Sequence, residues 1–283
     1  MQVGCVMGDL QPTLAEAVAA AELVQQQRRQ DPGLAISRGE AEALLALDRM
    51  QPDAPESWRD FIANAVADHI VSVEPAGILT EEKADWLLRT VAPNARVETV
   101  AAFETLMRAI ETARETSASL AVFALVEVRA AIINGDGQTI GLRPHFTRVI
   151  AAEHTALLYR ILIAAGGAEG KPVTRAEADA LFDLHDATAC SDNDLAFNEL
   201  FFRSIANHVL AASGHGQEPR QVALAPDFIL KADLRPNAEQ TAWISERIMR
   251  DGRPTLAEFE LLMLIGAEAK PDASLRSLLD SAA

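Results

Sequence analysis

The chain has 283 residues, of which 49% are hydrophobic, and a formal net charge of −16. A chain of this length can bury one large core or two ordinary ones. Its negative charge repels phosphate backbones and anionic lipid head groups, so we expect neither nucleic acid nor membrane as a partner.

The composition favours helices throughout the chain. Ala and Leu dominate and aromatic residues make up only 5%, which predicts an all-α fold. The opening MQVGCVMGDLQ lacks the basic region, apolar run and small-residue cleavage site of a secretory signal, so we expect a cytoplasmic protein. Cys5 and Cys190 lack paired spacing, which indicates neither a disulfide framework nor a thiolate metal site.

Apolar residues recur at helical spacing in successive segments of the first part of the chain. The expected helices cover 36–47, 60–71, 77–88 and 96–107. The stretch SLAVFALVEVRAAII (119–133) is too short to span a bilayer and contains Glu127 and Arg129, so it predicts a buried core helix.

The second part repeats the plan of the first. After the loop NGDGQTI (134–140), we expect a helix over 145–167. ISRGEAEALLAL (36–47) then aligns with VTRAEADALFDL (173–184), and 60–71 aligns with 199–210, which places His69 on His208. The helix start at 96–107 aligns with the one that follows Gly252. These matches predict about five helix-loop-helix hairpins in two equivalent halves, 1–116 and 117–283.

The pentapeptide PTLAE, present near both ends, predicts helix starts. Its Thr can accept a backbone N–H bond and its Glu can bond back to the N–H of the capping residue. The same Ser/Thr-x-x-Glu arrangement occurs at Thr13/Glu16, Ser37/Glu40, Thr174/Glu177 and Thr255/Glu258.

The two halves differ in the length of one connector, and the two ends of the chain each resemble part of a repeat. The second half carries a longer connector over 213–237, which is either a functional loop or a packed cover of apolar core surface. The segments 273–283 and 1–7 each look like half a repeat. We expect them either to complement one another, within one chain or in a homodimer, or to be ordinary frayed ends.

The segment LHDATACSDNDLAFNELF (184–201) holds the richest polar cluster. Aligned as a calcium loop ending at Glu199, it places Asp192 and Asp194 at two ligand positions, whereas Thr188 and Cys190 stand where acids are wanted. Calcium affinity rises with ligand charge, so the sequence predicts weak binding or none.

The string DGRPTLAE (251–258), with its Asp-Gly-x-x-Thr-x-x-Glu form, resembles the helix-start motif of TerB-like tellurite-resistance proteins and, more distantly, of EF-hands. The wider pattern around GILTEEKADWLL (77–88) also resembles an uncharacterised family of helical proteins from alphaproteobacteria. The TerB-like resemblance implies an all-helical fold and a divalent-cation site that includes Asp251 and Glu258.

Several histidines lie beside acids, and their role stays open between two interpretations. They are His69, His154, His185 and His208. Imidazole suits transition metals, but a lone histidine near a helix end more often bonds a carbonyl or complements the helix dipole. No phosphate loop, nucleophile elbow or dinucleotide fingerprint is present.

We therefore expect a non-enzymatic acidic helical repeat protein that binds a protein partner, with no cofactor. The alternative is a TerB-like protein that binds a divalent cation weakly or responds to metal stress. The third interpretation is an enzyme with an unrecognised site.

Overall fold

The structure is a computed structural model that describes residues 35–51, 54–135, 137–142, 148–212, 218–228, 237–250 and 254–266, with the single positions 23 and 26. Within these residues the chain is all-helical, with eleven α-helices and one 3-10 helix, which confirms the predicted fold class. In chain order they are α2 (Arg38–Arg49), α3 (Glu56–Ser72), α4 (Glu81–Val91), α5 (Val100–Thr112), α6 (Ala118–Asn134), η1 (Gly137–Ile140), α7 (Ala152–Ala165), α8 (Arg175–Thr188), α9 (Leu195–Ala212), α10 (Arg220–Ala223), α11 (Ala238–Ile248) and α12 (Leu256–Gly266).

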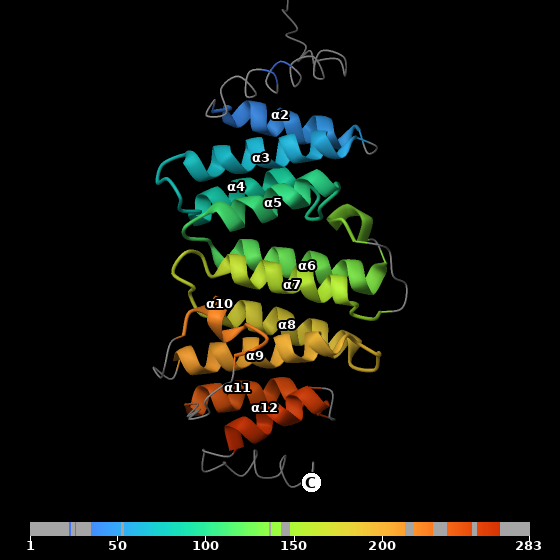
Figure 1. Cartoon of the computed structure of the whole chain (residues 1–283), viewed down its shortest axis with the longest axis vertical. Coiled ribbons are helices and arrows are strands. Elements are labelled where there is room, and N and C mark those ends of the chain that lie inside the picture. The colour runs from blue at the N-terminus through green and yellow to red at the C-terminus, as the bar shows by residue number, and fades with distance from the viewer. Residues whose placement is uncertain are drawn as a thin grey trace, which may run out of the picture.

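The helices lie across the long axis of the molecule and stack along it (Figure 1). Helices α4 and α5, α6 and α7, α8 and α9, and α11 and α12 form successive layers, with α2 and α3 at the end where the described chain begins. One hydrophobic cluster runs through the stack, with members from α2 to α12. Among the described residues, no helix is long and apolar enough to cross a membrane.

Capping boxes begin three of these helices where the sequence predicts them. Ser37 with Glu40 and Thr174 with Glu177 form both reciprocal hydrogen bonds. Before α12, the Thr255 N–H and hydroxyl donate to Glu258 Oε2, and the Glu258 N–H donates to Thr255 Oγ1. Each cap stabilises its helix by about 1 kcal/mol. The predicted Thr13/Glu16 box lies outside the described residues.

The helix predicted over 145–167 begins later than the sequence pattern indicates. The described backbone of Arg148 is left-handed (φ 53°), and Ala151 is extended, so α7 begins at Ala152. His154 closes this start, because its Nδ1 accepts the Ala151 N–H at 2.9 Å. The left-handed Arg148 and the extended Ala151 thus interrupt the helix that the apolar periodicity predicts over this segment.

Helix α6 confirms the predicted buried core helix. Its core-facing side chains Leu120, Leu125 and Val128 are at most 2% exposed, whereas Val126 on the outer side of the helix is exposed. Glu127 is also buried, and its Oε1 lies 3.0 Å from Arg96 Nε while its Oε2 accepts the Val97 N–H. The one acidic residue inside this helix therefore ties α6 to the segment that leads into α5.

The same four-residue arrangement occurs in both predicted halves. In the first half, the Trp86 indole donates to Glu42, the Arg38 guanidinium lies 5.3 Å from the Trp86 ring centroid, and His69 meets that ring edge-on. In the second half Trp243, Asp179, Arg175 and His208 make the corresponding contacts, with the guanidinium 4.1 Å from the ring centroid. These shared contacts agree with the alignment of His69 on His208. Internal duplication itself stays a prediction.

Backbone hydrogen bonds join the loops along one edge of the stack. Arg114 N donates to Gly77 O (2.8 Å), Ala168 N to Arg114 O (2.9 Å), and Arg220 N to Gly170 O (2.9 Å). Each loop is therefore held by the next, and the edge satisfies polar backbone groups that helix ends leave unpaired.

The long connector is anchored by a buried ion pair. Within the connector, Arg220 is 1% exposed and donates to both carboxylate oxygens of Glu177, each at 2.8 Å. Its remaining N–H groups reach the carbonyl oxygens of Lys171, Leu162 and Pro172. For residues 218–228, the packed-cover interpretation of the connector fits this arrangement.

We predict that Arg220→Ala lowers the free energy of unfolding by about 3–5 kcal/mol, because it leaves the Glu177 carboxylate buried without its counter-charge. Urea denaturation followed by circular dichroism measures the change. Arg250→Ala is the matched control, since this exposed arginine also pairs with an aspartate, and its loss should cost less than about 1 kcal/mol. A similar small loss for both variants would contradict the prediction.

Candidate functional site

The structure does not gather the three acids predicted for a calcium loop into one group. Asp194 Oδ1 accepts the Ala196 N–H at the start of α9, and Glu199 is a 62% exposed side chain that pairs with Arg203 one turn later. Asp192 lies exposed in the turn between α8 and α9. Calcium binding by these residues stays a prediction that the geometry does not favour.

The polar atoms of this turn are used in closing it. Asn193 Nδ2 donates to Thr188 O and Oγ1, and Asn193 Oδ1 accepts the Ile150 N–H at 2.9 Å. The Asn193 side chain therefore ties the turn between α8 and α9 to the segment before α7.

Glu258 lies in a different cluster, between α8 and α12. Glu258, His185 and Asp186 each offer one ligand atom, and these atoms lie within 4.8 Å of one another. No other group of three His, Cys, Asp or Glu side chains in the described part of the chain meets this distance. Asp251, the predicted partner of Glu258, lies outside the described residues.

The cluster is buried and its members also hold the helices together. His185 is stacked on Phe201 with ring centroids 4.3 Å apart, its Nε2 lies 3.3 Å from Thr255 Oγ1, and its Nδ1 lies 3.9 Å from Glu258 Oε1. Since Glu258 Oε2 completes the capping box, only part of this carboxylate faces the histidine.

Two arginines supply positive charge at the outer side of the cluster. Arg247 and Arg250 lie 3.9 and 3.8 Å from Asp186 Oδ2, and both donate to Asp183 Oδ1. Burial opposes the ionisation of Asp183, but the hydrogen bonds and charges of these arginines outweigh it and lower the pKa of Asp183. A cation bound here would compete with both guanidinium groups for Asp186.

The corresponding junction of the first half carries Asp48 in place of His185. Asp48 is 2% exposed, it bonds the side chain of Thr99 at the start of α5, and its Oδ2 has no hydrogen-bond partner among the described residues. Burial raises the pKa of Asp48, although the Thr99 hydrogen bond and the charges of Arg59 and Arg49 partly oppose this shift.

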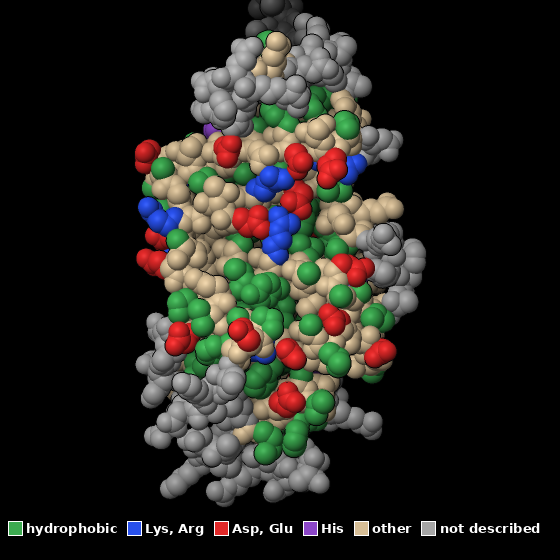
Figure 2. All heavy atoms as spheres, viewed as in Figure 1, with side chains coloured by type: hydrophobic (Ala, Val, Ile, Leu, Met, Phe, Trp, Pro, Cys, Tyr) green, Lys and Arg blue, Asp and Glu red, His purple; other side chains and the backbone are tan. Residues whose placement is uncertain are grey.

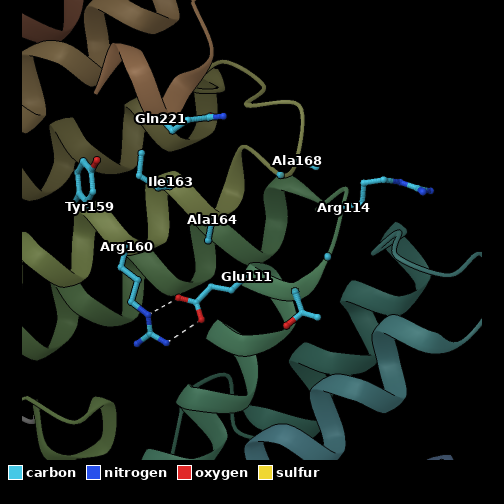
Figure 3. Close-up of a pocket in the computed structure, with 11 residues that line it drawn as sticks. Glu111, Arg114, Tyr159, Arg160, Ile163, Ala164, Ala168 and Gln221 are labelled. Atoms are coloured by element: carbon cyan, nitrogen blue, oxygen red, sulfur yellow. Dashed lines mark hydrogen bonds and ion pairs between the residues drawn. The ribbon is translucent and has the colours of Figure 1, made fainter. Parts of the chain in front are cut away.

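A larger open groove lies between α5, α7 and α10, with a volume of about 770 Å³. Figure 3 shows Tyr159, Arg160, Ile163 and Ala164 along α7 on one side and Glu111 of α5 facing Arg160. Gln221 contributes from α10, while Arg114 points away from the other labelled side chains. The apolar members along α7 are half-buried, so the groove presents apolar surface to solvent.

The charged end of the groove is internally neutralised. Arg160 Nε donates to Glu111 Oε1 at 2.5 Å, and its two terminal nitrogens donate to Glu104 at 3.2 and 3.1 Å. The hydrogen bond to Glu111 is the largest cause that raises the pKa of Arg160, and Glu104 adds to it against the cost of burial. One guanidinium thus holds two carboxylates and leaves one excess negative charge at this end.

Gly167 allows the α7–α8 loop to pack closely against the α5–α6 loop beside the groove. Its φ of +63° is left-handed, and a Cβ at this position would lie 2.4 Å from Arg114 O. The loop can therefore approach the α5–α6 loop closely enough for Ala168 N to donate to Arg114 O.

Comparison with known proteins adds no assignment. No family model, curated protein or solved structure matches this chain. The resemblance to TerB-like proteins and EF-hands stays a prediction, and the function has to be argued from the residues themselves.

Sequence reasoning identified Glu258 and noted His185, but it separated them because they lie far apart in the chain. It did not identify the groove at all. Its apolar lining residues, such as Tyr159 and Ile163, have the spacing of core positions on a helix. Only the Gly-Gly of AAGGAEG (164–170), which marks a close loop approach, could have pointed to it.

We predict that Asp48→Asn raises the free energy of unfolding at pH 7. The pKa of Asp48 is higher in the folded protein than its ordinary value of 3.8, so the cost of ionising it is absent below that value and complete above the folded pKa. The gain over the unsubstituted protein should shrink as the pH falls towards about 3. Urea denaturation of both proteins across this range tests the sign. A variant that is less stable at pH 7 would show that the charged carboxylate stabilises the fold.

Proposed function

We propose that this chain is a non-enzymatic helical scaffold whose α5–α7–α10 groove binds a basic, amphipathic segment of another protein. The observation that carries the proposal is the open groove of about 770 Å³, with half-buried apolar side chains along α7 and an acidic pair at one end.

The lining supports recognition by burial of an apolar anchor. Ile163 lies about one turn after Tyr159 on α7 and Ala164 follows it directly, so the three supply an apolar side, and Ala113 also lines the groove. Large partly exposed side chains of this kind dominate the binding energy of protein interfaces when a partner covers them. The described lining contains no His, Cys or Ser, which supports binding over chemistry.

The charge of the molecule supports a basic partner. The formal net charge is −16, and Figure 2 shows acidic side chains around and below a hydrophobic area at mid-height on the face in view. Such a field attracts Lys and Arg side chains and raises association rates, while the apolar area supplies specificity of position. Glu111 is exposed at the edge of the groove, where it can accept a hydrogen bond from the partner.

Selection of random peptides on the immobilised protein tests this proposal. We expect the selected peptides to combine Lys or Arg with a bulky apolar residue, and Ile163→Asp to weaken their binding at least about tenfold by placing a charge in the apolar lining. Val126→Asp is the matched control, because Val126 is an exposed apolar residue outside the groove lining and its change should leave binding unaltered. Neutral or acidic peptides, or equal binding to both variants, would contradict the proposal.

A second candidate function is divalent-cation binding at His185, Asp186 and Glu258, which deepens the alternative drawn from the TerB-like resemblance. The observation in its favour is that one ligand atom from each of these side chains lies within 4.8 Å of the other two. His185 and Glu258 are buried and Asp186 is half-buried. Imidazole with carboxylates suits Zn²⁺ better than Ca²⁺, which takes oxygen ligands alone.

We predict for this candidate that excess Zn²⁺ raises the Tm of chelator-treated protein, by mass action on the folded state. His185→Gln should abolish the shift, whereas His69→Gln should retain it, since His69 is not a member of the cluster. Calcium should have no effect. An equal zinc shift in both variants would place the ion elsewhere and reject this site.

A further inference from the structure

We propose that the small cavity between α2, α3, α5 and η1 binds a free α-amino acid with a small side chain, whose ammonium group meets Asp48 and whose carboxylate meets Arg59 and the start of α5. This site is separate from the groove and does not depend on the function proposed for it.

The cavity has the size of a small metabolite. Its volume is about 170 Å³. Drug-sized ligands occupy pockets of about 300–1,000 Å³, so this space fits only a few non-hydrogen atoms. Its lining comprises the polar or charged residues Asp48, Gln51, Arg59, Glu98, Thr99, Gln138 and Thr139 together with the apolar Val100 and Ala101.

Two carboxylates, those of Asp48 and Glu98, line the cavity and favour a cationic group. Asp48 is 2% exposed, and its Oδ2 has no hydrogen-bond partner among the described residues. A buried carboxylate oxygen without a hydrogen-bond donor costs free energy, so a ligand that donates to it is favoured. Glu98 also lines the cavity, where its Oε1 accepts a hydrogen bond from Asn94 and its Oε2 lies 3.8 Å from Arg49 Nε. An ammonium group can therefore donate to the open oxygen of Asp48.

The opposite charge is present on the same cavity, on the half-buried Arg59. The Arg59 side chain makes no hydrogen bond or ion pair among the residues that the structure describes, although its charge acts on Asp48. The first backbone N–H groups of α5, at Val100 and Ala101, have no acceptor within the helix, since the Thr99 cap takes the N–H of Ala102. A helix start of this kind favours a carboxylate.

The arrangement selects a ligand that carries both charges. A metal ion would face Arg59 and Arg49, and a simple anion would face Asp48 and Glu98, so each would meet repulsion on one side. A zwitterion carries one charge of each sign and can meet both kinds of side chain at once. Gln51 and Gln138 add side-chain amides that can donate or accept between them.

The second half lacks this constellation. The alignment that puts Ser37 on Thr174 puts Asp48 on His185, and the alignment of Val100 on Leu256 puts Glu98 on Pro254. His185 stacks on Phe201 and turns its Nε2 towards Thr255. The chain therefore offers one amino-acid site of this kind among its described residues.

Titration with glycine and L-alanine, each up to about 10 mM, tests the proposal by Tm and by saturation-transfer NMR on the full chain. We expect both amino acids to raise the Tm and to give transfer signals, while acetate and methylammonium, which carry one charge each, bind at least tenfold more weakly. Bulky amino acids such as L-tryptophan should not bind.

Asp48→Asn and Arg59→Gln should each weaken glycine binding at least tenfold, and Asp192→Asn should leave it unchanged as a matched exposed control. Circular dichroism verifies that each variant is folded, and Arg59→Gln keeps the test decisive if the buried Asp48 tolerates no change. Absence of glycine binding to the unsubstituted protein, or glycine binding to either Asp48→Asn or Arg59→Gln as tight as to the unsubstituted protein, would overturn the proposal.

Discussion

The buried ion pair between Arg220 and Glu177 is the constraint on which the second half of the stack depends. A charge pair removed from water is costly unless all its polar atoms are satisfied. Here Arg220 meets the carboxylate and three carbonyl oxygens, and Glu177 also completes the capping box of α8. One carboxylate thus fixes both the start of a helix and the path of the connector.

The ion pair also shapes the groove. Because Arg220 is held against α8, its neighbour Gln221 lies over the α7–α8 loop and lines the groove. The fit is close, since a Cβ on Gly170 would lie 2.3 Å from Gln221 Oε1 and 2.8 Å from Pro219 Cβ. The stack of helices supplies the apolar side of the groove, and the anchored connector supplies its end. The groove that we propose as a binding surface therefore ends at the anchored connector.

Local signals in the sequence predicted the helices well because their causes are local. The capping boxes at Ser37, Thr174 and Thr255 and the apolar run of α6 depend on neighbouring residues alone. The start of α7 was placed too early because the left-handed Arg148 interrupts an otherwise helical pattern. The sites depend on contacts between distant residues. Glu258 was found through its motif, whereas its approach to His185, and that of Asp48 to Thr99, required the packing of one helix end on another.

The two helix junctions that the sequence alignment pairs differ in their chemistry. In both, the threonine that caps a helix also bonds a side chain from the end of another helix, Asp48 in one case and His185 in the other. Because the threonine caps its helix in both places, either an aspartate or a histidine can bond to it without changing the helix start. An imidazole can stack on an aromatic ring and fill its space, as His185 does on Phe201, whereas a short carboxylate leaves room beside it. That difference in size, together with the exchange of Glu98 for a proline, leaves a charged cavity at one junction and a closed polar cluster at the other.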